Sequence, residues 1–187
     1  MREASVTPTA VANYHTLMTA TDQPYQLLGN DGVFRLEDQS ILWISVKSLY
    51  QPWLHERLNE CTVKQPLLMP VSIVKNEQQT WIDFLSKSNF TLTEVAGKAL
   101  LKEVPADFRH LPWVRLFSAA AMADVQSLAS LSEVLSTALI DSGDNSVANR
   151  VISWFLAQPA KSQTLIEQSH AETKSLQALT EWLSSES

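Results

Sequence analysis

Residues 65–74 constrain the fold more than any other part of the sequence. They read Gln-Pro-Leu-Leu-Met-Pro followed by Val-Ser-Ile-Val. The apolar residues are typical of a strand, but Pro66 and Pro70 lack the backbone N–H that a central strand needs. We therefore expect residues 65–70 on the edge of a sheet or outside it. Residue types alone leave two interpretations open: a core strand with an irregular start, and a surface that a partner protein recognises.

The composition is typical of a globular protein. The chain has 187 residues, of which 45% are hydrophobic and 18% are charged, and this balance is enough to bury a core. No apolar run reaches the roughly 18 to 20 residues that would span a bilayer, and the start does not resemble a signal peptide. Residues 1–12, rich in Thr, Ala and Ser, are typical of a linker. We expect a cytoplasmic protein with no membrane contact.

The residues offer no pattern for catalysis, metal binding or cofactor binding. Cys61 is the single cysteine, the four histidines have no metal-binding spacing, and four glycines cannot build a phosphate-binding loop. Glu56 and Glu60, like Glu37 and Asp38, are interpreted as solvated surface. The net charge of −6 argues against a broad DNA-binding face, so we expect DNA contact to be weak or indirect. The sequence indicates a binding module and not an enzyme.

The first half of the chain predicts strands interrupted by a helix. Residues 14–20 predict a strand, and residues 25–28 and 33–36 predict a hairpin around the turn Gly-Asn-Asp-Gly. Between residues 41 and 58 the apolar positions follow one helical face, but Pro52 lies inside the pattern, and we expect it to kink or restart the helix.

After residue 75 the pattern changes to helix, hairpin and helix. Asn76 is expected to cap a helix whose apolar positions are Trp81, Ile82 and Leu85. A hairpin over residues 90–104 turns at Ala96-Gly97, and Pro112 is placed to begin a helix with Trp113, Leu116, Phe117 and Ala120 on its buried face.

The last third of the sequence predicts mainly helices. Ser130 and Glu133 match a capping box before a helix, and Val147, Val151, Trp154 and Phe155 line another that Pro159 ends. Residues 161–168 are expected to form a short turn. Leu176, Leu179 and Leu183 then predict an amphipathic C-terminal helix. The whole order predicts an α+β fold with an inserted block.

The order of these segments resembles the C-terminal domain of the MutL family of DNA mismatch-repair proteins. The resemblance rests on the hairpin at residues 27–33, the Gln-Pro-Leu-Leu-Met-Pro segment, the hairpin leading to Val104-Pro105, and the helix that contains Trp154. In this family a Gln-x-x-Leu-x-Pro pattern docks on the replication sliding clamp. The resemblance thus implies a docking site at Gln65, Leu67, Leu68, Met69 and Pro70.

The resemblance also implies an organisation and a set of partners. Residues 13–75 and 128–187 would form a discontinuous dimerisation subdomain, and residues 76–127 an external regulatory subdomain. The chain would be part of a longer protein, a homodimer that links two N-terminal ATPase heads. Its partners would be the sliding clamp of DNA polymerase III and, through the full-length protein, MutS, the MutH nuclease and the UvrD helicase.

One departure from the family pattern bears on chemistry. Many relatives carry the metal-binding motif Asp-Gln-His-Ala-x-x-Glu-x-x-x-x-Glu, together with a Cys-Pro-His segment that has no counterpart here. In this sequence Asp38-Gln39 is followed by Ser40 and Ile41, and Ile44 and Leu49 occupy the two Glu positions. Apolar side chains cannot ligate a divalent metal, so we expect a MutL-like domain without nuclease activity. A metal-dependent DNA-nicking endonuclease and an unrelated small α+β adaptor remain as alternatives.

Overall fold

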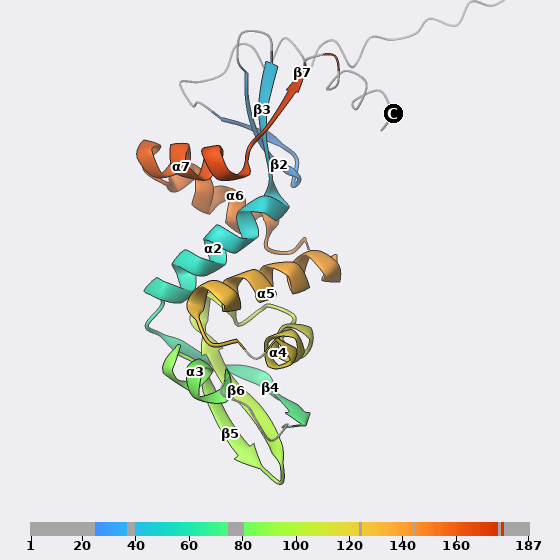
Figure 1. Cartoon of the computed structure of the whole chain (residues 1–187), viewed down its shortest axis with the longest axis vertical. Helices are drawn as coiled ribbons and strands as arrows, with labels where there is room; N and C mark the ends of the chain where they lie inside the picture. Colours follow the sequence, from blue (N-terminus) through green and yellow to red (C-terminus); the bar gives the residue numbers. More distant parts are fainter. Residues whose placement is uncertain are drawn as a thin grey trace, which may run out of the picture.

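The fold is α+β, as predicted, with two antiparallel sheets separated by helices. The computed structural model describes residues 25–36, 40–74, 81–123, 125–143, 145–175 and 177. Within them the strands form one sheet of four strands, in the order β1-β2-β3-β7, and one of three, in the order β4-β6-β5. Figure 1 shows the sheets at opposite ends of an elongated molecule, with the helical layer between them.

The four-stranded sheet combines the beginning and the end of the described chain. It contains β1 (Gln26–Leu28), β2 (Gly32–Leu36), β3 (Ser40–Ser45) and β7 (Glu172–Ser175). The predicted hairpin is confirmed, with Leu28 paired to Gly32 across the turn. Gly29 in this turn has a φ of +52°, a left-handed conformation that glycine adopts without steric cost. β3 and β7 were not predicted as strands.

Helix α2 (Val46–Glu60) follows β3 directly and runs to its end without interruption. The side chain of Ser45 caps it by accepting a hydrogen bond of 3.2 Å from the backbone N–H of Ser48. Pro52 does not restart the helix, because one helix continues from Val46 to Glu60 with Pro52 inside it. Pro52 removes one backbone hydrogen bond, but the buried face on both sides of it holds the helix in place. The predicted face is confirmed, with Val46, Leu49, Tyr50, Trp53 and Leu54 all buried.

The three-stranded sheet contains β4 (Lys64–Val74), β5 (Thr91–Val95) and β6 (Lys98–Pro105). Ala96 and Gly97 turn the predicted β5–β6 hairpin with φ values of +49° and +73°. β4 pairs antiparallel with the free side of β6, so the predicted boundary at residue 75 cuts through one sheet. The reason is that β6 offers an unpaired row of backbone groups that β4 satisfies. β4 therefore belongs with the inserted hairpin.

The helices that cover this sheet follow the sequence pattern closely. α3 (Trp81–Lys87) buries Trp81, Ile82 and Leu85, and α4 (Trp113–Met122) begins immediately after Pro112. The predicted buried face of α4 is confirmed, with Trp113, Leu116, Phe117 and Ala120 turned inward. A single 3₁₀ turn, η1 (Ala106–Phe108), connects β6 to this region.

The cap of α5 (Leu128–Ser142) lies one turn earlier than predicted. Ser127 is the N-cap, and its hydroxyl accepts a hydrogen bond of 3.1 Å from the backbone N–H of Ser130. The capping box is therefore formed by Ser127 and Ser130, not by Ser130 and Glu133. The helix begins nearer the N-terminus than the predicted start, and Leu131, one turn inside it, is buried. Gly143 ends it in a left-handed conformation.

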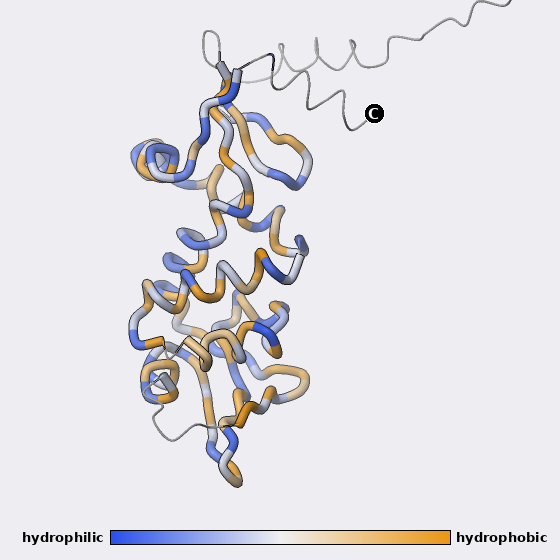
Figure 2. The backbone as a smooth tube through the Cα atoms, turned by 45° about the vertical axis from the view of Figure 1, so that its right-hand side comes forward, coloured by the Kyte–Doolittle hydropathy of each residue, from blue (hydrophilic) through white to orange (hydrophobic). Residues whose placement is uncertain are grey.

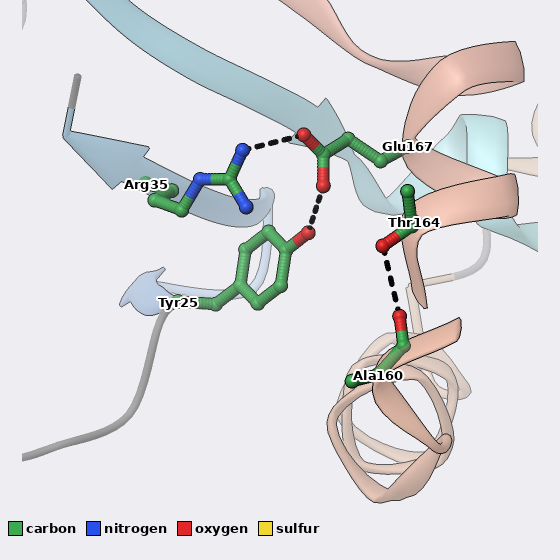
Figure 3. Close-up of polar contacts among 5 residues, drawn as sticks. All are labelled: Tyr25, Arg35, Ala160, Thr164 and Glu167. Atoms are coloured by element: carbon green, nitrogen blue, oxygen red, sulfur yellow. Dashed lines mark hydrogen bonds and ion pairs between the residues drawn. The ribbon is translucent and has the colours of Figure 1, made fainter. Parts of the chain in front are cut away.

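Two further helices follow, and the second of them was predicted as a turn. α6 (Ala148–Ala157) is the predicted Trp154 helix, and α7 (Ala160–His170) occupies the region where we expected a short turn at residues 161–168. α7 has no buried residue, so its sequence lacks the apolar stripe that predicts a helix. Figure 3 shows how Glu167 attaches it instead, by hydrogen bonds from the side chains of Tyr25 and Arg35.

One hydrophobic core extends through the helical layer into the three-stranded sheet. Trp53 of α2 packs edge-on against Phe108, with ring centroids 5.3 Å apart, and this contact joins the two parts of the molecule. Trp81–Phe117 and Phe90–Trp113 form similar edge-to-face pairs at 5.4 and 5.5 Å. Figure 2 shows apolar residues, in orange, along the three-stranded sheet as well as in the helices.

Some predicted elements lie outside the described residues. These are the linker at residues 1–12, the strand at residues 14–20, the cap at Asn76 and the helix containing Leu176, Leu179 and Leu183. Among the helices that the structure does describe, none combines the length and the apolar character needed to cross a membrane.

Candidate docking site

The docking segment, defined as residues 65–70, lies on β4 at the edge of the three-stranded sheet. The prediction that two prolines would keep this half of the stretch out of a central position is confirmed. Leu68 is 90% exposed and Met69 is 80% exposed. Single exposed apolar side chains are common on protein surfaces, whereas neighbouring ones that form a contiguous patch mark interaction sites.

The backbone pairing of β4 changes in the middle of the docking segment. Pro66 lies opposite Glu103, and the next paired residue of β4, Val71, lies opposite Leu101. Residues 67–70 therefore face Lys102 alone on β6. This arrangement is an extended form of a β-bulge, which bends the strand and releases it from its neighbour. The bulge is what turns Leu68 and Met69 outward.

Both flanks of the bulge are anchored. The strand before it is held by the backbone hydrogen bond from Ala106 N–H to the carbonyl of Val63, at 2.9 Å. Leu67 packs against the hydrophobic core, and so do Val71 and Ile73 after the bulge. The segment is therefore a fixed projection with one apolar anchor, Leu67.

The structure separates the five predicted site residues into two groups. Gln65, Leu68, Met69 and Pro70 are exposed, and Leu67 is half-buried. The alternative interpretation of residues 65–74 as a core strand is wrong for Leu68 and Pro70. The exposed residues of this extended segment are a Gln, two apolar residues and a Pro. A partner protein can contact them with its own side chains and backbone.

Ile44 and Leu49, which fall at the two Glu positions of the metal-binding motif, are part of the core, and Ser40, at its His position, is half-buried. Ile41, Ile44 and Leu49 are all less than 2% exposed, while Asp38 and Gln39 lie outside the described residues. Over the ranges that the structure describes, no group of three or more His, Cys, Asp or Glu residues could hold a metal ion.

One residue that the sequence suggested was solvated surface has a defined role. The carboxylate of Glu56 accepts a hydrogen bond of 2.7 Å from the indole N–H of Trp154 and one of 3.0 Å from the side-chain amide of Gln158. Trp154 is 98 positions away in the chain, so no local pattern around Glu56 could have predicted this contact.

Comparison of the chain with models of protein families gives no match, and comparison with curated proteins gives none either.

Proposed function

We propose that the chain is the C-terminal dimerisation and partner-docking domain of a MutL-like DNA mismatch-repair protein. It joins two ATPase heads and presents docking segments, and it has no nuclease activity of its own. The observation that carries this proposal is the projection of Leu68 and Met69 from an edge strand at the place where the Gln-x-x-Leu-x-Pro pattern falls.

The docking segment would bind the sliding clamp of DNA polymerase III. Extended segments on sheet edges bind partners through backbone groups and alternate side chains. Leu68 and Met69 supply apolar anchors that become buried in a partner pocket, which is where most binding energy arises. The sheet holds the segment in place, and this reduces the entropy lost on binding.

Self-association would place two such segments on one particle. Trp43, half-buried on β3, and Leu36, exposed on β2, lie on the face of the four-stranded sheet opposite to Val33 and Ile44, beside the buried side chains of Phe34 and Ile41. A homodimer with two-fold symmetry would bring the same apolar patch of both chains together. In the full-length cytoplasmic protein, this dimer would coordinate MutS, MutH and UvrD, with weak or indirect DNA contact.

The docking role is tested by titrating purified sliding clamp into the chain and measuring the heat of binding. The double variant Leu68→Ala/Met69→Ala is compared with Val95→Ala, which shortens an exposed apolar side chain at the end of β5 in the same sheet. We expect the double variant to bind at least tenfold more weakly, equivalent to about 1.4 kcal/mol, and Val95→Ala to bind like the wild type.

Because Leu68 and Met69 are exposed, their replacement should leave the unfolding temperature unchanged. A double variant that retains wild-type affinity for the clamp would overturn the docking proposal. Absence of binding by the wild-type chain would do the same.

A further inference from the structure

A hollow of about 420 Å³ lies between helices α2, α5, α6 and α7. Its size falls within the range of known ligand sites. The hollow is separate from the docking segment, which lies on β4 in the three-stranded sheet. It is formed mainly by α2 and α7, whose facing residues include Pro52 and Glu56 on one side and Leu165 and Ile166 on the other.

The carboxylate of Glu56 is held in the wall of this hollow. Both of its hydrogen bonds, from Trp154 and from Gln158, go to the same oxygen, Oε1. Trp154 is only 5% exposed, so its indole N–H fixes the carboxylate from the protein side. Within the described chain, no residue donates to the second oxygen, Oε2, and no Lys or Arg pairs with the group. Oε2 is thus oriented and available to a cation.

The opposite wall, formed by α7, carries the apolar side chains of Leu165 and Ile166 together with Ser162 and His170. Leu165 is 58% exposed, and Ile166 beside it is partly buried and packs against the core. α7 has no fully buried residue, and Leu165 is its exposed apolar side chain beside the hollow. The lining residues include no Lys or Arg, and the basic side chains among them are His55 and His170. The site therefore combines one oriented negative charge with an adjacent apolar surface.

We propose that this hollow binds a peptide segment of a partner protein, with an arginine side chain against Glu56 and an aliphatic side chain against Leu165 and Ile166. Charge complementarity favours a cationic partner twice, locally at Glu56 and globally through the net charge of −6. Arginine fits better than lysine because its planar, weakly hydrated guanidinium forms directional hydrogen bonds with a carboxylate and packs on apolar surface. The proposal is independent of sliding-clamp docking.

The test uses two libraries of hexapeptide amides. In one, arginine is fixed at the third position and the others are randomised. In the matched library citrulline, a neutral urea of nearly the same size and shape, replaces arginine. Peptides retained by the immobilised chain are sequenced, and the best binder is titrated into ¹⁵N-labelled protein. The indole N–H resonance of Trp154 reports directly on occupation of the site, because that N–H is bonded to Glu56.

We expect the arginine library to yield aliphatic-containing binders that shift the Trp154 indole resonance. Glu56→Gln keeps an acceptor for Trp154 but removes the charge, and it should weaken binding at least tenfold. Glu60→Gln is the matched control, since Glu60 lies on the same helix, pairs with Arg57 and does not line the hollow. It should bind like the wild type.

Three results would overturn the proposal. The first is equal retention of the arginine and citrulline peptides. The second is the absence of any Trp154 shift with the retained peptides. The third is a change in the mass of the particle when Glu56→Arg is introduced, because a second copy of the chain would then be the occupant. The unfolding temperature of Glu56→Gln, measured in parallel, separates loss of binding from loss of the fold.

Discussion

The hydroxyl of Tyr25 donates a hydrogen bond of 2.6 Å to Oε2 of Glu167, a residue 142 positions later in the chain. The other oxygen of Glu167 accepts a bond of 2.6 Å from Nη2 of Arg35 (Figure 3). Glu167 thus connects α7 to the four-stranded sheet. This bridge matters because α7 has no buried side chain to hold it, and α7 forms one wall of the proposed peptide site.

Replacement of Glu167 by alanine should lower the free energy of unfolding by about 2 kcal/mol. The change leaves the Tyr25 hydroxyl and the Arg35 guanidinium without their shared acceptor, and hydrogen bonds to charged groups contribute about this much. Urea unfolding measures the difference. Glu172→Ala is the control: it removes an exposed pair with Lys174 at 3.6 Å, which should contribute less than about 0.5 kcal/mol. Equal losses in both variants would contradict the role of the Glu167 bridge.

The same bridge should make stability fall at alkaline pH. Burial of the Tyr25 ring, followed by its hydrogen bond to Glu167 and the charge of that carboxylate, raises the pKa of Tyr25 above its ordinary value of 10.0. The folded state therefore keeps the proton more tightly than the unfolded state. The stabilisation is complete below pH 10 and is lost as the pH rises from there toward the folded pKa. Tyr25→Phe should show a smaller fall in unfolding free energy between pH 9 and pH 11 than the wild type does.

Gly32 should not tolerate a side chain, because β3 passes directly beside it. A Cβ atom there would meet the backbone carbonyl oxygen of Ile44 and lie 2.9 Å from the ring of Trp43. We expect Gly32→Ala to lower the free energy of unfolding by about 2 kcal/mol or more. In Gly29→Ala the new methyl group has open space, and only the positive φ of +52° opposes it, at about 1 kcal/mol. A smaller effect at Gly32 than at Gly29 would contradict this packing.

Thermal and urea unfolding should also distinguish the true cap of α5 from the one that the sequence suggested. Ser127→Ala removes the acceptor for the N–H of Ser130 and should cost about 1 kcal/mol. Glu133 is exposed, and Glu133→Ala should change stability by less than about 0.5 kcal/mol. The reverse order would mean that the helix begins near Ser130.

Strong local patterns in the sequence predicted most of the architecture. The turn at Gly29, the hairpin at Ala96-Gly97 and the start of α4 at Pro112 depend on the backbone preferences of single residues: glycine permits a positive φ, and proline fixes φ near the helical value. The buried faces of α2 and α4 followed from apolar spacing, and the edge position of residues 65–70 followed from two missing backbone donors. These features need no knowledge of distant contacts.

The elements that were missed depend on distant contacts. α7 lacks an apolar stripe and is held by Glu167, whose partners Tyr25 and Arg35 lie at the other end of the chain. β7 is exposed along its whole length and is a strand because β3 offers it an edge. β4 was predicted as an edge strand, but its pairing with β6 was not predicted, because apolar spacing does not specify which strand it pairs with.

In the candidate sites, too, local features could be predicted from the sequence and features that depend on distant contacts could not. Exposure of the docking segment could be expected from its prolines. The bulge, in which residues 67–70 lie opposite Lys102 alone, depends on the register between β4 and β6. No local sequence pattern predicted the hydrogen bond to the Glu56 carboxylate, because its donor, Trp154, lies on a helix 98 positions away.

Sedimentation equilibrium tests most directly whether the chain forms a homodimer that displays two docking segments. The chain of 20.9 kDa would be measured alone and with added sliding clamp, as the wild type and as Leu68→Ala/Met69→Ala. We predict twice the chain mass for both proteins alone, and a heavier complex with the clamp for the wild type only. A monomer at micromolar concentration, or a double variant that binds the clamp like the wild type, would contradict the account.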